Sequence, residues 1–443
     1  MLKLTFLGTS AGVPTKQRNV TALAIECLNP YLSGAQQGNK SQSANQNKKS
    51  RPWLLIDCGE GTQQQLLHTK LSLHQLAAAG VPTKQRNVTA LAIECLNPYL
   101  SGAQQGNKSQ SANQNKKSRP WLLIDCGEGT QQQLLHTKLS LHQLAAICIT
   151  HVHGDHCYGL PGLLASAAMS GRREPLTLIA PKAIATLLEA ITLTTELYLP
   201  FALNFIAIEE VLSEQSDTNK VNILLSDQHQ LDIDITLLSH RVASHAFGIT
   251  QTIHHRTLDT DKLLAQGIPA SALWGKLQQG HDVITEEGQQ LCAGDYVNDD
   301  LSRTRVVVAG DNDTPACLTA ALVDTDLLVH EATYTHEVLT KIQGKNPEFD
   351  PMHSSAQSVA GFVEKSGVNN LILTHFSARY QSFDNPNSKT PNMAYIRLDA
   401  ESVYKGNLWL AADFDQYIVN GAAELVDKPD NNHVQYLGSA RGR

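Results

Sequence analysis

Residues 147–162 read ICITHVHGDHCYGLPG and place three histidines and an aspartate within six positions, directly behind a short apolar run. Imidazole and carboxylate groups at this density are typical ligands of Zn²⁺, and Mn²⁺ and Fe²⁺ take similar sets. His151 and His153, two apart on an extended segment, can face one ion. Asp155 and His156 follow a turn and can face another. The cluster therefore predicts a centre for two metal ions.

Two ions need further ligands, and polar residues that follow apolar strands elsewhere can supply them. His240 follows ITLLS, Asp311 follows VVVAG and His375 follows LILT. Sites at strand ends are common in α/β enzymes because a rigid sheet holds the side chains. Isolated polar residues at strand ends are also often structural, and for His240 taken alone this alternative stays open.

The elements that must position these residues alternate between strands and helices. Short Val, Ile and Leu runs predict strands at 175–180, at RVVVAGD and at NNLILTH, and helical patterns fall between them. A helix is expected over PACLTAALVD, and another over SSAQSVAGFVEKSG with Ser354 as its N-cap. This alternation predicts an α/β protein.

Residues 11–78 recur at 79–146 without a substitution. A single perfect doubling is not a repeat fold, which would need several diverged units. The expected fold takes 19–26 from the first copy and 121–136 from the second, with 53–96 looped out at polar surface segments. The longer loop costs only about 1.2 kcal/mol of closure entropy.

Composition restricts the class of protein. The chain has 443 residues, 42% of them hydrophobic, and no apolar run long enough to span a membrane, which predicts a cytoplasmic globular protein. The net charge of -7 argues against indiscriminate binding to polyanions. Eight cysteines without a C-x-x-C pair do not imply disulfides. Residues 426–443 are polar and are expected to be a disordered tail.

Together these stretches resemble a known family. HVHGDH matches the H-x-H-x-D-H signature of the metallo-β-lactamase fold, and WLLIDCGEGTQQQLLHT, GLPGLL, LVHEATY and LILTHFSARY are similar to ribonuclease Z. The resemblance runs from residue 1 to about 420, interrupted by the doubling. It implies one αβ/βα sandwich domain over 1–425, a homodimer, two Zn²⁺ per chain, and removal of the 3′ trailer from precursor tRNA.

The resemblance also implies roles for individual residues. Asp155 would accept the proton of the attacking water, and His330 would protonate the leaving 3′ oxygen while Glu331 orients it. His353, Ser377 and Arg379 would support the site or position a phosphate, as could Arg18, which has a twin at Arg86. The implied first ion is held by His151, His153 and His240, the second by Asp155, His156 and His375, with Asp311 bridging them.

Two features depart from the family pattern. His240 lies eight residues before Gly248, where the family has six, so His245 is a rival ligand. An arm at about 251–295 corresponds to the family's tRNA-gripping arm, but Ala270, Ser271 and Ala272 replace its Gly-Pro. Its mixed charge predicts modest, salt-sensitive affinity.

The leading hypothesis is a zinc-dependent tRNA 3′-endonuclease. One alternative is another dinuclear metal phosphodiesterase of the same fold, because fold does not fix substrate. A third is a catalytically impaired RNA-binding form, if the doubling disrupts the site. Hydrolysis of β-lactams is not expected, since His156 and the HEAT and HFSARY stretches resemble the phosphodiesterase branch.

Overall fold

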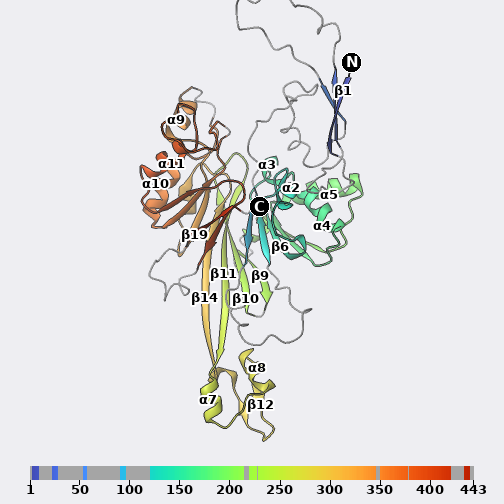
Figure 1. The fold of residues 1–443 in the computed structure, drawn as a ribbon, viewed down its shortest axis with the longest axis vertical. Helices are drawn as coiled ribbons and strands as arrows, with labels where there is room; N and C mark the ends of the chain where they lie inside the picture. Colours follow the sequence, from blue (N-terminus) through green and yellow to red (C-terminus); the bar gives the residue numbers. More distant parts are fainter. Residues whose placement is uncertain are drawn as a thin grey trace, which may run out of the picture.

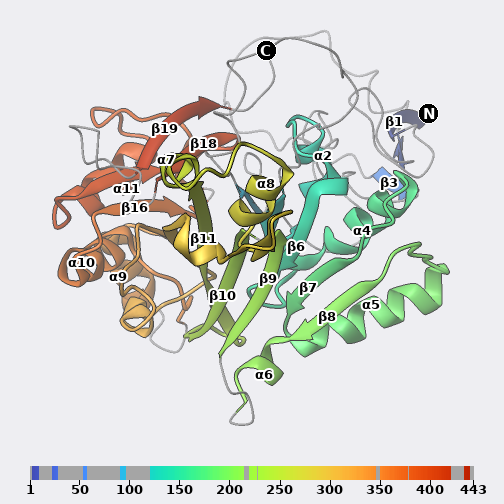
Figure 2. The same cartoon turned by 90° about the horizontal axis from the view of Figure 1, so that it is seen from below.

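Two β-sheets pack face to face, and helices cover the outer face of each (Figure 2). The computed structural model describes residues 90–95, 120–213, 219–226, 228–345, 350–377, 379–420 and 434–439, and the backbone of three strands at 2–8, 22–27 and 53–56. The layer order is helices, sheet, sheet, helices. The predicted αβ/βα sandwich is confirmed.

The first sheet has the strand order β4-β5-β6-β7-β8. Its β5 to β8 run parallel, and β4 pairs antiparallel with β5. The strands are β4 (Leu91–Glu94), β5 (Trp121–Ile124), β6 (Leu144–Cys148), β7 (Leu176–Ala180) and β8 (Leu203–Ala207), and the helices are α2 (Thr130–Leu134), α3 (Gly154–Cys157), α4 (Leu160–Met169), α5 (Lys182–Thr195) and α6 (Ile208–Val211).

The second sheet has the order β17-β16-β15-β14-β11-β10-β9. Its β14 to β17 are parallel, whereas β9, β10 and β11 pair antiparallel. The strands are β9 (Lys220–Ser226), β10 (His229–Leu238), β11 (Ser244–Leu258), β14 (Val297–Ala309), β15 (Leu327–Glu331), β16 (Asn370–Thr374) and β17 (Asn407–Leu410), and the helices are α9 (His336–Lys345), α10 (Ala356–Ser366) and α11 (Met393–Glu401).

Strand periodicity builds the core. Leu122 and Ile124 of β5 join the apolar cluster between the sheets, while Trp121 and Leu123 face the helix side with α4. Successive side chains of a strand point to opposite faces, so an apolar run can fill both layers. Among the described residues, no helix is both long and apolar enough to cross a bilayer.

The parallel strands of both sheets end toward the same region. The chain leaves β6, β14 and β16 just before His151, Asp311 and His375 respectively. His240 follows β10, which runs parallel to β14 because each is antiparallel to β11. Side chains far apart in sequence thereby meet at one edge of the sandwich.

Strands β11 and β14 continue beyond the body of the sheet and carry a small module (Figure 1). This module contains α7 (Thr260–Ala265), α8 (Ala272–Gln278), β12 (Val283–Ile284) and β13 (Gln290–Leu291), and it has its own core around Leu263, Leu277 and Leu291. It occupies the range in which the sequence predicted an arm.

The duplicated region differs from expectation. The second copy supplies both strands of its hairpin to the first sheet, because Leu91–Glu94 pairs with Trp121–Ile124. The first copy forms a separate sheet of β1 (Leu2–Gly8), β2 (Ala22–Cys27) and β3 (Trp53–Ile56). The prediction that 19–26 joins the second copy and that 53–96 loops out was wrong. With identical strands available, the shorter connection within one copy costs less closure entropy.

Three smaller expectations also need correction. Only a short 3₁₀ helix, Pro315–Leu318, forms within the expected helix over PACLTAALVD. The N-cap of α10 is Ser355 and not Ser354, and its side chain and that of Ser358 cap each other's backbone. Part of the expected disordered tail is ordered, since β19 (Val434–Ser439) pairs with β18 (Asp415–Val419) and buries Val434. The remaining tail lies outside the described residues.

Candidate metal centre

The HVHGDH stretch lies between β6 and α4 and turns through the single-turn helix α3. His151 is fully buried, and His153 immediately precedes α3. Asp155 and His156 sit on α3, with Asp155 exposed and His156 buried. The extended part and the helical turn thus present His151 with His153, and Asp155 with His156, as two pairs of side chains.

Four residues form the first group of ligand atoms. His153 Nδ1 lies 3.1 Å from His151 Nε2 and 3.2 Å from His240 Nε2. Oδ2 of Asp311 lies 3.8 Å from the Nε2 atoms of both His151 and His240. The four ligand atoms are all within 4.8 Å of one another.

Three residues form a second group beside the first. Nε2 of His156 and Nε2 of His375 lie 3.7 Å and 3.6 Å from Oδ2 of Asp155. Both nitrogens are also 3.5 Å from Oδ1 of Asp311. One carboxylate oxygen of Asp311 therefore faces each group, which is the arrangement of a bridging ligand.

The donor set fits metal ions better than it fits hydrogen bonding among the side chains. Among the described residues, Nε2 of His156 is buried without a hydrogen-bond partner, and burying this polar atom would be costly if it had no ligand. Ligand atoms of a tetrahedral zinc are about 3.3 Å apart when each metal–nitrogen bond is 2.0–2.1 Å. The contacts of 3.1–3.8 Å in both groups match that spacing.

The outer nitrogens of the histidines are fixed by hydrogen bonds. Nδ1 of His151 donates to Thr150 Oγ1 at 2.9 Å, and Nδ1 of His240 donates to the carbonyl oxygen of Met352 at 2.8 Å. Nδ1 of His375 donates to Thr333 Oγ1 at 3.2 Å. Such outer partners set the tautomer that leaves Nε2 free for a metal.

Asp125 holds His156, and sequence reasoning did not single it out. Its Oδ2 accepts from His156 Nδ1 at 2.7 Å, while its Oδ1 accepts from the backbone nitrogen of Thr150 at 2.7 Å. Asp125 follows β5 in the IDCG stretch, a strand-end position like those that were noticed. That position was the available signal, but a buried supporting carboxylate has no spacing pattern of its own.

Two residues at the centre have left-handed backbone conformations. The φ angles of Asp125 and His375 are 60° and 54°. This conformation costs free energy in any residue other than glycine, and residues that adopt it concentrate at functional sites. Here the hydrogen bonds of both side chains hold the backbone in place.

Charge proximity shifts the pKa values of the cluster. Burial would raise the pKa of Asp311, but His375, His156 and His151 hold it well below its usual value. Burial would lower the pKa of His375, yet Asp311 and Asp155 raise it to about 9. For His151, burial and the neighbouring His156 lower the pKa to about 2. The carboxylates therefore stay ionised, ready for a cation.

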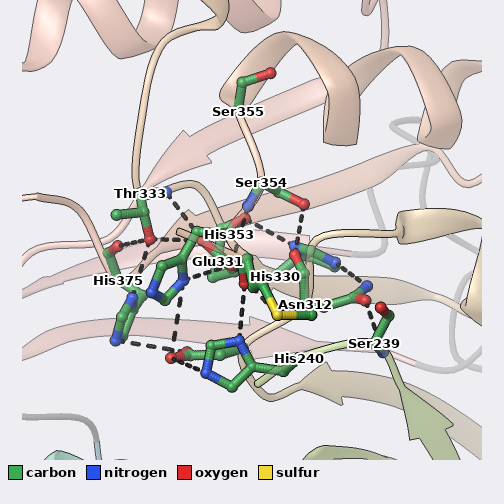
Figure 3. Close-up of polar contacts among 12 residues, drawn as sticks. Ser239, His240, Asn312, His330, Glu331, Thr333, His353, Ser354, Ser355 and His375 are labelled. Carbon is green, nitrogen blue, oxygen red and sulfur yellow. Dashed lines mark hydrogen bonds and ion pairs between the residues drawn. The ribbon is translucent and has the colours of Figure 1, made fainter. Parts of the chain in front are cut away.

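Beside the ligands, Glu331 anchors a hydrogen-bond network (Figure 3). Its Oε1 accepts from His353 Nδ1 at 2.9 Å and from the backbone nitrogen of Ser354 at 3.1 Å. Its Oε2 accepts from Thr333 Oγ1 at 2.6 Å. Thr333 in turn contacts His375, so the network reaches the second ligand group.

His330 does not occupy the position that the sequence interpretation gave it. Its ring is fully buried, Nδ1 donates to the carbonyl oxygen of Glu331 at 2.7 Å, and Nε2 contacts Asn312 Nδ2 at 3.1 Å. Burial lowers the pKa of His330. With both nitrogens engaged inside the protein, His330 cannot reach a substrate, and the histidine paired with Glu331 at the ligand cluster is His353.

The remaining candidates are His245, Arg379 with Ser377, and Arg18. His245 is buried, and its Nδ1 donates to the carbonyl oxygen of Thr150 at 2.8 Å, so His240 is the histidine that reaches the cluster. Arg379 is exposed, contacts Ser377 Oγ through Nε at 3.2 Å, and stacks over Tyr334 at 5.1 Å. Arg18 lies outside the described residues.

An αβ/βα sandwich whose strand ends gather histidines and aspartates is the metallo-β-lactamase fold, which defines the chain as a metal-dependent hydrolase. A ribonuclease Z of Marinobacter nauticus is 41% identical over 80% of this chain and 98% of its own length. A ribonuclease Z of Pseudomonas putida is 44% identical over 77% of this chain and 93% of its own. The chain belongs to the ribonuclease Z family, whose members are endoribonucleases.

Two other comparisons are less informative. The family model described as anti-Pycsar protein Apyc1 matches residues 103–198, which contain the HVHGDH stretch. The crystal structure of human tRNase Z, short form, aligns with a TM-score of 0.42 at 22% identity, over 68% of this chain and 90% of that one. A similarity at that level carries no argument about the site.

Proposed function

We propose that the chain is a zinc-dependent endoribonuclease that removes the 3′ trailer from precursor tRNA, with two Zn²⁺ per chain. The observation that supports this best is Asp311, whose two carboxylate oxygens each face one group of histidines at 3.5–3.8 Å. Two neighbouring ions of this kind supply an activated water and neutralise charge on a phosphodiester. Mn²⁺ and Fe²⁺ take similar ligands and are tested as replacements.

Asp155 is the proposed proton acceptor. It is the exposed member of the second group, with a side chain 48% exposed, so it can face both the ligand cluster and a substrate. Burial would raise its pKa, but the hydrogen bond with His375 and the charge of His156 lower it. Asp155 is therefore ionised at neutral pH and can accept a proton from an attacking water.

His353 is the proposed donor to the leaving 3′ oxygen, in place of His330. Burial would lower its pKa, but Glu331 raises it through the 2.9 Å hydrogen bond to Nδ1. That bond leaves Nε2 to hold the transferred proton. Glu331 orients the ring, and backbone donors from Asn312 and Ser354 fix the carboxylate.

Groups outside the ligand cluster would bind the tRNA. Ser377 and Arg379 lie two and four residues beyond His375, and the guanidinium of Arg379 suits a phosphate. The arm between β11 and β14 projects from the body and would grip the tRNA away from the cleavage point (Figure 1). We also propose one domain over 1–425, a homodimer and a cytoplasmic location.

The test is cleavage of a precursor tRNA that has a short 3′ trailer. We expect a single cut at the trailer junction, loss of activity after chelation, and recovery with Zn²⁺. Activity that persists in a chelator would contradict the mechanism. Cleavage of bis(p-nitrophenyl) phosphate without cleavage of the tRNA would favour another phosphodiesterase of this fold. Tight tRNA binding with no bound metal would favour an impaired RNA-binding form.

A further inference from the structure

The outer edge of β4 is the end of the first sheet. Within the part of the chain that the structure describes, β4 pairs with β5 on one side, and no strand is paired with its other side. Leu91, Ala92 and Ile93 are only half-buried there. An unpaired strand edge presents backbone donors and acceptors that can take up another strand.

The same strand exists twice in this chain, and its other copy has both edges filled. Strand β2 pairs with β3 as β4 pairs with β5, at equivalent positions: Ile25 with Leu54, and Ile93 with Leu122. The second edge of β2 is occupied by β1, with Lys3 opposite Glu26 and Thr5 opposite Ala24. Strand β1 has no second copy, because the repeat begins at residue 11.

We propose that the open edge of β4 is a docking site for Leu2–Gly8 of the same chain, so that the two copies compete for one opening strand. The register follows from the sequence identity of β2 and β4. Lys3 would lie opposite Glu94, Leu4 opposite Ile93, Thr5 opposite Ala92 and Phe6 opposite Leu91. The opposite charges of Lys3 and Glu94 suit this register.

The two faces of the docked strand would match the sheet. Leu2, Leu4 and Phe6 alternate with Lys3 and Thr5 and would share a face with Cys95, Ile93 and Leu91. That face borders the apolar cluster between the two sheets, in which Cys95 is buried and Leu91 and Ile93 are partly buried. Docking would therefore extend an existing core.

The tether between β1 and β4 is long enough to allow docking. Because it is longer than the tether between β1 and β2, it disfavours docking weakly. Strand β1 is tethered to β2 by residues 9–21 and to β4 by residues 9–90. The longer tether lowers the effective concentration of β1 at β4 by about 15-fold, from the −3/2 power dependence on length. Burial of three apolar side chains against the intersheet core must outweigh this factor.

Disulfide trapping tests the pairing. Opposed residues of antiparallel strands have Cα atoms about 4.5–5.5 Å apart, within the range of a disulfide. The variant T5C/A92C can close a disulfide only in the proposed pairing, and T5C/A24C only in the pairing with β2. In T5C/A24C/A92C one thiol chooses between the two copies. T5C/I93C is the control, since Ile93 points to the other face.

We expect an intrachain disulfide in oxidised T5C/A92C, and a majority of position 92 over position 24 in the triple variant, both read by peptide mass spectrometry. In each double variant the single substitution at 24 or 92 gives the otherwise identical tryptic peptides different masses. In the triple variant, where both positions are cysteine, an added Val88→Ile marks the peptide of the second copy. Cross-linking of T5C/A24C alone, with T5C/A92C left reduced, would overturn the proposal. Disulfide-linked dimers of T5C/A92C would also overturn it and assign the edge to a second chain. The readout needs neither metal nor RNA, so it is independent of the proposed function.

Discussion

Oδ2 of Asp125 lies 2.7 Å from Nδ1 of His156, and this contact orients the imidazole whose Nε2 is buried without a hydrogen bond among the described residues. The same carboxylate binds the backbone and side chain of Thr150, which supports His151. One buried aspartate thus orients a ligand from each metal group, although it contacts neither set of ligand atoms directly.

Asp125→Ala should weaken metal binding by about 10- to 100-fold, the usual effect of losing an outer partner of a ligand histidine. Asp125→Asn should lose less, because its amide oxygen can still accept from His156. Zinc affinity measured by competition with a chromophoric chelator checks both variants. Equal affinity of Asp125→Ala and the parent would refute the positioning role.

His353→Ala should lower kcat by about 10²- to 10⁴-fold while both metals stay bound, because the variant loses a proton donor and no proposed ligand. The pH–rate profile should lose its alkaline limb, which the parent owes to deprotonation of His353. Metal content by elemental analysis serves as the control. A loss of metal that parallels the loss of rate would instead make His353 a ligand, as its proximity to Asp311 and His375 allows.

His240→Ala should remove one metal ion per chain, and His245→Ala should retain both. His240 Nε2 faces Asp311 and His153, whereas His245 Nδ1 is bonded to the backbone of Thr150. The two variants are a matched pair, since each removes one buried or half-buried imidazole near the end of β10 or the start of β11. Two ions bound to His240→Ala would overturn the assignment.

The metal-free protein should become less stable as the pH rises through about 9. Asp311 and Asp155 raise the pKa of His375 from 6.5 to about 9. A raised folded-state pKa contributes stability that is fully present below the unfolded value and lost above the folded one. The difference corresponds to on the order of 3 kcal/mol. Thermal unfolding after chelation, compared between about pH 6 and about pH 10, measures it.

Zinc binding supplies the complementary check. A ligand imidazole must be deprotonated, so binding near neutral pH should release the proton of His375, and the release should fall as the pH passes about 9. Calorimetry in buffers of different ionisation enthalpy counts the protons. Release that did not change with pH would contradict the raised pKa.

Sequence patterns predicted much of the fold because the relevant signals are local. The strands over 175–180, RVVVAGD and NNLILTH are set by short apolar runs, and the structure contains them as β7, β14 and β16. The helix expected over PACLTAALVD failed, because its apolar residues pack as a 3₁₀ turn against the end of the sheet. Local propensity is overridden there by tertiary packing.

The sequence by itself determined the ligand types, because HVHGDH needs only a turn to present two pairs of side chains, and strand-end residues share an edge whenever their strands are parallel. Tertiary structure alone decided that Glu331 pairs with His353 and not with its neighbour His330. Adjacent residues on a strand point to opposite faces, and the partner arrives from a loop 22 residues later. It also decided which copy of the repeat builds the sheet. Identical sequences carry identical local signals, so only chain connectivity and packing distinguish them.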